Sequence, residues 1–258
     1  MLGLIVVVFL LSFTAFFFKK LSMSGSFMAF IVGTMIVYGL QLEGLVLLGI
    51  FFVSSTALGA FFQKKKQNDI VEKGDRRDGF QVIANGGVAA VCASMFGVTN
   101  EPLWVVAFVG SLAAANADTW ASEIGTLSRK KPISILSFQR VERGTSGAIS
   151  FLGTVASLCG AIAIAVPAVI LFESLISWTS VYIFVLFVLA GWFGSTVDTL
   201  IGAFMQNVNE CSVCQRKTEK RYHCQQKTIP VFGFRWITND TVNLCCTITG
   251  AVVAVLFI

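Results

Sequence analysis

The sequence predicts an all-α integral membrane protein, a bundle of about eight transmembrane helices. Only 13% of its 258 residues are charged and 55% are hydrophobic, whereas a soluble domain carries about 25% charged residues. Apolar runs of about 20 residues recur along the chain, and a helix needs this length to cross hydrocarbon about 30 Å thick. These observations exclude a soluble enzyme, a disordered chain, a secreted disulfide scaffold and a nucleic-acid-binding module.

The apolar runs predict eight helices within one membrane domain, residues 1–258. The expected helices span 2–18, 22–40, 45–63, 79–98, 103–128, 146–172, 179–206 and 238–258, and a cysteine-containing loop spans 207–237. The tripeptides Ala117-Asp118-Thr119 and Val197-Asp198-Thr199 occupy equivalent places in two of these helices. This weak repeat predicts that the last four helices form two related hairpins.

The basic residues predict the topology. All 19 lysines and arginines fall in four alternate loops, within 19–20, 64–77, 129–143 and 216–235, while the other loops hold only Glu43, Glu101 and Glu173. The positive-inside rule places the four basic loops in the cytoplasm and both chain termini outside.

Five acidic residues lie at or near the predicted cytoplasmic ends of helices: Asp78, Asp118, Glu123, Asp198 and Asp240. Acids within a membrane are costly and usually functional. A transporter would keep polar residues near the midplane, whereas an enzyme acting at the inner face would place them here. The alternative is that the acids pair to hold helices together or extend to the interface.

Helical spacing groups other polar residues with these acids. The groups are Asp78 with Gln81 and Asn85, Asp118 with Ser122, Asp198 with Gly202 and Gln206 beside Ser195 and Thr199, Asp240 with Asn243, and a hydroxyl stripe of Ser146, Ser150, Thr154 and Ser157. Such stripes are also common packing devices. Glu123 lies about 140° around an ideal helix from Asp118, so it either contacts another neighbour or the helix is distorted there.

Helix polarity assigns chemistry to the two kinds of helix end. Three helices begin at the cytoplasmic face, where free N–H groups, glycine, hydroxyl and arginine suit a phosphate. The residues at these starts are Arg76, Arg77, Asp78 and Gly79; Arg143, Gly144, Thr145, Ser146 and Gly147; and Thr238, Asn239, Asp240 and Thr241.

Two other helices end at the same face, where the helix dipole favours a cation. Asp118-Thr119 and Asp198-Thr199 lie in their final turns. Such carboxylates suit Mg²⁺, which binds one or two carboxylates together with substrate phosphate oxygens. The sequence therefore predicts phosphoryl or nucleotidyl transfer.

The cysteine-containing loop has the pattern of a metal site. Cys211-x-x-Cys214 is followed by His223-Cys224, which resembles a structural Zn²⁺ site. The alternative is unligated or redox-active thiols, because a reducing compartment does not favour disulfides.

At these residues the sequence resembles a known family. The matching stretches are 76–78 with Gln81 and 85–87, 117–125 (ADTWASEIG), 143–150 (RGTSGAIS), Asp198-Thr199 with Gly202, and the cysteine loop. Together they resemble the integral-membrane family of domain-of-unknown-function ninety-two, also called the transmembrane-protein-nineteen family. The resemblance covers the chain from about residue 20 onward.

That family includes the chloroplast phytyl-phosphate kinase of tocopherol synthesis. The resemblance therefore implies a kinase that uses CTP to turn a prenyl monophosphate into a diphosphate. The sequence contains no Walker A pattern, so this chemistry needs another phosphate cradle. The lack of a transit peptide and the richness in Phe favour a bacterial cell membrane over a chloroplast membrane.

The predicted function is transfer of a phosphoryl group from an NTP to a prenyl or polyprenyl monophosphate at the cytoplasmic membrane face. In this hypothesis Asp118 and Asp198 bind Mg²⁺, and Glu123 positions or helps to bind it. Arg143 holds the nucleotide phosphates, while Arg76 and Arg77 neutralise charge in the transition state.

The expected partners are a lipid phosphate, an NTP and membrane lipid, without nucleic acid. Two alternatives stay open. A CTP-dependent nucleotidyltransferase would use the same groups on a lipid phosphate, and a lipid or small-molecule transporter would need polar residues deeper in the bilayer.

Overall fold

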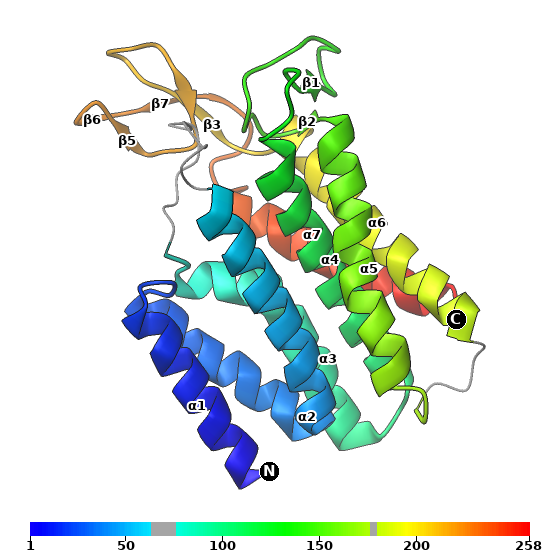
Figure 1. Ribbon diagram of the computed structural model, residues 1–258. Helices are drawn as coiled ribbons and strands as arrows, with labels where there is room; N and C mark the ends of the chain where they lie inside the picture. The colour runs from blue at the N-terminus through cyan, green and yellow to red at the C-terminus, as the bar shows by residue number, and fades with distance from the viewer. Residues whose placement is uncertain (63–75, 176–179) are drawn as a thin grey trace.

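The computed structural model describes residues 1–62, 76–175 and 180–258 and confirms the predicted helical membrane bundle (Figure 1). Its helices are α1 (Leu2–Phe17), α2 (Met23–Phe62), α3 (Gly79–Thr99), α4 (Leu103–Gly125), α5 (Phe151–Leu171), α6 (Ser180–Phe204) and α7 (Asn239–Leu256). Within the described residues, five helices are long and apolar enough to cross a membrane, namely α2, α3, α5, α6 and α7. The predicted helix ends at residues 63 and 179, and the basic residues Lys64, Lys65, Lys66 and Lys73, lie outside the described residues.

Helix α2 contains two of the predicted helices. Gln41 interrupts it with φ 45° and ψ −128°, and the arms 23–40 and 42–62 run in opposite directions (Figure 1). Gly44 lies three residues after Gln41, at the start of the second arm, and a Cβ there would lie 2.7 Å from Ile36 Cγ2. A glycine is therefore required where the two arms meet.

The predicted helix 146–172 begins later than expected, at Phe151. Gly144 and Gly147 have φ of 84° and 71°, a left-handed backbone that an α-helix does not contain. Ser150 is the residue that caps the helix, because its side chain accepts a hydrogen bond from the Gly153 N–H at 3.1 Å. The prediction that Ser146 lies in a helical stripe is therefore wrong.

The remaining helix ends differ by a few residues. The predicted helices 103–128 and 179–206 end at Gly125 and Phe204. Gly202 remains on the α6 helix, and a Cβ there would lie 2.6 Å from Ser146 Oγ. The end of α6 therefore packs directly against the loop that leads into α5.

Short antiparallel strands cover the end of the bundle that lies away from both termini (Figure 1). Strand β1 (Ile133–Ser134) pairs with β2 (Ala148–Ile149). In the predicted cysteine loop, β3 (Val208–Glu210) lies between β4 (Lys217–Thr218) and β7 (Ile229–Phe232), and β5 (Tyr222–His223) pairs with β6 (Gln226–Lys227). The loop is thus a folded β unit.

Helix α4 is the centre of the bundle, and all of residues 105–117 are buried. Glycines of its neighbours allow very close approach: a Cβ on Gly194 of α6 would lie 2.5 Å from Ala114 Cβ, and one on Gly250 of α7 would lie 2.4 Å from the Gly110 carbonyl oxygen. Small residues bring membrane helices together in this way. The C-terminal turns of α4 and α6 are held side by side as a result.

We predict that Gly194→Ala lowers the melting temperature of the detergent-purified protein, because the added methyl group overlaps Ala114 Cβ and forces α4 and α6 apart. Overpacking of this kind costs about 1–3 kcal/mol. The matched control is Gly3→Ala, another helical glycine, where a Cβ meets nothing within 4 Å. Equal melting temperatures for the two variants would contradict the close packing of these helices.

Candidate active site

A cavity of about 1840 Å³ opens among the helix ends near the strands, and all five predicted acids line it. The other predicted site residues that line it are Arg77, Gln81, Asn85, Thr119, Ser122, Arg143, Gly144, Thr145, Ser146, Gly147, Ser150, Thr199, Asn239 and Asn243. Arg76 is exposed and is absent from the lining, and Gly202 contributes only by packing against Ser146.

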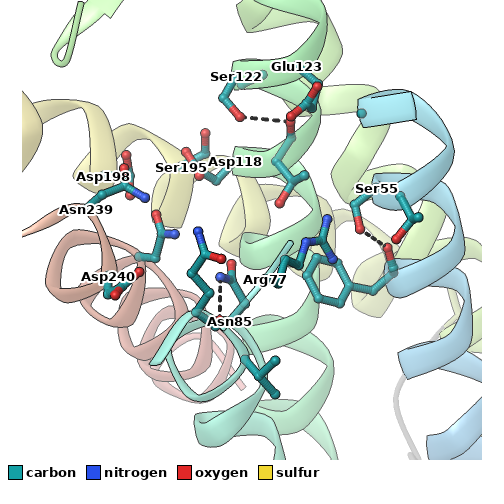
Figure 2. Close-up of a pocket in the computed structure, with 18 of the residues that line it drawn as sticks. Ser55, Arg77, Asn85, Asp118, Ser122, Glu123, Ser195, Asp198, Asn239 and Asp240 are labelled. Carbon is teal, nitrogen blue, oxygen red and sulfur yellow. Dashed lines mark hydrogen bonds between the residues drawn. The ribbon is translucent and has the colours of Figure 1, made fainter. Parts of the chain in front are cut away.

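The carboxyl groups of Asp118 and Asp198 lie against each other in this cavity (Figure 2). The Asp118 carboxyl group lies close to the side chains of Asp198 and Ser195. The Asp198 Oδ1 atom is buried and has no hydrogen-bond partner among the described residues. Both residues are half-buried, and two carboxylates this close repel each other when both are charged. The pair therefore favours either a shared proton or a bound cation.

The threonines that follow these acids form hydrogen bonds within their own helices. Thr119 Oγ1 donates to the Ala115 carbonyl oxygen at 2.8 Å, and Thr199 Oγ1 donates to that of Ser195 at 3.0 Å. Ser122 likewise donates to the Thr119 carbonyl oxygen at 3.0 Å. The carboxylates are therefore the side chains of these turns with the greatest capacity to bind a ligand.

Helix α4 continues as a regular helix to Gly125. The Glu123 side chain therefore leaves the helix on a different side from Asp118 and faces a different neighbour. Its carboxylate faces α2, about 4 Å from where a Cβ of Gly59 would lie. The Arg77 guanidinium is nearby, over the rings of Phe51 and Phe52 at 5.9 and 5.7 Å from their centroids. Burial lowers the pKa of Arg77, and the Glu123 carboxylate opposes that shift.

The start of α3 is closed by its own side chains. Asp78 accepts a hydrogen bond from the Gln81 N–H at 2.9 Å, and Gln81 Oε1 accepts one from the Asp78 N–H at 3.2 Å, which is a capping box. Ser24 Oγ accepts from the Gly79 N–H at 3.2 Å. The predicted phosphate cradle at this helix start is therefore already filled by protein groups.

The start of α7 differs, because its N-cap Thr238 makes no side-chain cap hydrogen bond. Asn239 and Asp240 form its first turn and line the cavity beside Asp198 (Figure 2). Of the helices that begin at the predicted cradles, α3 and α5 have a side-chain cap and α7 does not. The cradle predicted around Arg143 is a loop rather than a helix start.

Sequence reasoning missed Glu219, Lys220 and Arg221, which line the cavity from the β unit. A chain of hydrogen bonds places the first of them: Gln206 Nε2 donates to Glu219 Oε1 at 2.8 Å, and Gln206 Oε1 accepts from Ser146 Oγ at 2.5 Å. No periodic pattern marks these residues. Only their position inside the cysteine motif could have indicated a fixed location.

An apolar arm of the cavity extends between α1 and the two arms of α2. Its lining includes Val8, Leu11, Val32, Leu48 and Phe52, with Gly33 and Gly49. The cavity therefore joins a polar end, rich in acids and basic groups, to an apolar stretch lined by α1 and α2. An amphiphile with a charged head group and an apolar tail has polar and apolar parts that match these two regions of the cavity.

The four predicted metal ligands form a separate cluster. Cys211, Cys214, His223 and Cys224 have ligand atoms that all lie within 4.8 Å of one another. None of the four lines the cavity. The cluster therefore belongs to the β unit rather than to the site between the helices.

Comparisons with known proteins match the chain to one family of integral membrane proteins and to several similar proteins. The family described as integral membrane protein DUF92 matches residues 6–251. Protein PGR of Arabidopsis thaliana is 30% identical over 91% of this chain and 88% of its own length. An uncharacterized membrane protein of Methanocaldococcus jannaschii is 30% identical over 88% of this chain and 81% of its own length. The chloroplastic protein VTE6 of A. thaliana is 28% identical over 92% of this chain and 65% of its own length. No solved structure gives a significant match.

We predict that Gln206→Ala destabilises the protein, because it removes the amide that contacts both Ser146 and Glu219. Loss of hydrogen bonds that leaves partly buried partners unpaired costs about 1–3 kcal/mol, so the melting temperature should fall. Gln139→Ala, at an exposed loop glutamine, is the matched control. An unchanged melting temperature for Gln206→Ala would show that the β unit is held over the cavity by other contacts.

Proposed function

The chain belongs to the integral membrane protein family DUF92, and from that premise we propose that it is a lipid-phosphate kinase. It transfers a phosphoryl group from a nucleoside triphosphate, CTP by the resemblance described above, to a prenyl or polyprenyl monophosphate. The reaction takes place at the membrane face that carries the strands. Topology prediction assigns this face to the cytoplasm.

One observation carries the proposal: the Asp118–Asp198 contact lies in a cavity that also extends as an apolar arm between α1 and α2. A prenyl tail suits the apolar arm, and its phosphate would then reach the polar end. Arg77, Arg143, Lys220 and Arg221 bring positive charge to that end. Both the tail and the charge of a lipid phosphate therefore have complementary surfaces.

The carboxylate pair fits a divalent cation. Asp198 Oδ1 is a buried acceptor without a hydrogen-bond partner among the described residues, and two carboxylates with phosphate oxygens are the ligands that Mg²⁺ prefers. Asp118 and Asp198 would hold the ion, which when bound neutralises negative charge on the reacting phosphates.

The chain's own residues supply positioning and charge. The basic groups hold the phosphates in line, and the acceptor phosphate oxygen attacks the terminal phosphorus of the nucleotide. One P–O bond forms as the bond to the nucleoside diphosphate breaks, so the products are a prenyl diphosphate and an NDP. A monophosphate oxygen is already ionised near neutral pH, so no strong general base is needed.

We predict that Asp118→Asn lowers kcat by about 10²–10³-fold, because it removes one of the two charges that bind the cation. The assay uses purified protein, Mg²⁺, prenyl phosphate and each NTP, with product mass as the readout. Ser111→Ala is the matched control in the same helix, since the buried Ser111 hydroxyl has no partner among the described residues.

Product mass also separates the proposal from its nearest alternative. A kinase yields a prenyl diphosphate, whereas a nucleotidyltransferase leaves a nucleoside monophosphate on the lipid and releases diphosphate. Absence of transfer with every nucleotide and chain length would overturn the kinase assignment. Equal kcat for Asp118→Asn and Ser111→Ala would remove the proposed role of the carboxylate pair.

We predict that Gly49→Phe raises KM for long-chain acceptors by about tenfold, the effect of losing roughly 1.4 kcal/mol of binding. Gly49 lines the apolar arm, and a Cβ there meets nothing within 4 Å, so the new ring fills space that the tail would use. KM for the nucleotide should stay the same. Gly3→Phe, at another open helical glycine, controls for the added ring, and equal acceptor KM values for both variants would place the tail elsewhere.

A further inference from the structure

The cluster in the β unit has the dimensions of a metal site. Cys214 Sγ and Cys224 Sγ lie 3.4 and 3.2 Å from His223 Nδ1. Zinc bonds of about 2.3 Å to sulfur and 2.0–2.1 Å to nitrogen put tetrahedral S and N ligands about 3.5 Å apart. The spacing of the three ligand atoms therefore matches a single Zn²⁺ between them.

The backbone turns in two places to bring the four ligands together. At the first, the Gln215 N–H donates to the Cys211 carbonyl oxygen at 2.8 Å, and the Cys211 N–H donates to that of Arg216 at 3.0 Å. This tight turn directs both cysteines of the C-x-x-C pair to one side. Cys211 is buried, with 1% of its surface exposed, as expected of a ligand at the base of a site.

The second turn joins β5 to β6 and has an unusual sequence. His223 pairs with Gln226, so Cys224 and Gln225 are the two turn residues, and their φ values are 49° and 62°. Two-residue turns with both φ positive strongly prefer Asn-Gly or a similar pair. A cysteine in this conformation is explained by the position of its thiol, which faces His223.

We propose that Cys211, Cys214, His223 and Cys224 bind one structural Zn²⁺ ion. Mixed thiolate and imidazole ligands in a tetrahedral arrangement select zinc over magnesium or calcium. The ion ties the turn before β4 to the turn after β5. Since both ends of segment 215–222 are then fixed, the segment between them has a defined path.

The fixed segment carries the residues that the β unit contributes to the cavity. Glu219, Lys220 and Arg221 lie between Cys214 and His223 in the chain and line the cavity wall. Asn209 Nδ2 donates to the carbonyl oxygens of Glu219 and Lys220 at 3.3 and 3.4 Å. Zinc therefore acts at a distance from the helices, by holding one charged segment of the cavity wall in place.

The first test measures bound metal in the full-length protein, purified in detergent under reducing conditions without a chelator. Elemental analysis should find about one zinc per chain, and Cys214→Ser and Cys224→Ser should each reduce it at least about fivefold. Cys159→Ser is the control, because Cys159 is an exposed cysteine of α5. Less than about 0.2 zinc per wild-type chain, or an equal loss in Cys159→Ser, would overturn the proposal.

Two further readouts keep the test decisive if a cysteine variant does not fold. Wild-type protein loaded with Co²⁺ in place of zinc should show the visible absorption of a tetrahedral thiolate site, and an octahedral spectrum would exclude these ligands. Hydrogen exchange should then be compared with and without a zinc chelator. Faster exchange across 215–222 on chelation supports the positioning role, and unchanged exchange there contradicts it. Neither readout depends on kinase activity, so failure of the proposed function leaves this test intact.

Discussion

The contact between Asp118 and Asp198 is the constraint on which the rest of the site depends. Two carboxyl groups meet inside a bundle of apolar helices, where an unbalanced charge is costly. They meet because glycines such as Gly194 let α6 approach α4 closely. Small residues in the centre of the bundle and acids at the helix ends are thus parts of one arrangement, which requires a shared proton or a cation.

The groups around this pair have separate tasks. Some side chains complete the fold, as Asp78 and Gln81 do by capping α3. Others join loops across the cavity, as Gln206 does between Ser146 and Glu219. The start of α7 and the basic residues Arg77, Arg143, Lys220 and Arg221 line the same cavity. A bound phosphate would therefore be held by the end of the bundle and by the β unit together.

Much of this arrangement could be predicted from sequence, because membrane burial imposes strong patterns. Apolar length located the helices, and the cost of intramembrane charge pointed to Asp118 and Asp198. The start of α5 could not be located, since left-handed glycines such as Gly147 look like ordinary helix residues in sequence. The place of Glu219 depends on tertiary hydrogen bonds and on the path of the cysteine loop, neither of which has a periodic signature.

The most direct test of the account is the location of a divalent ion in crystals of the protein grown with Mn²⁺, which has a measurable anomalous signal and replaces Mg²⁺ at oxygen sites. We predict an anomalous peak between the carboxylates of Asp118 and Asp198. A map in which the two carboxylates remain in contact but no peak lies beside them would contradict the account and leave the pair as a proton-sharing structural contact.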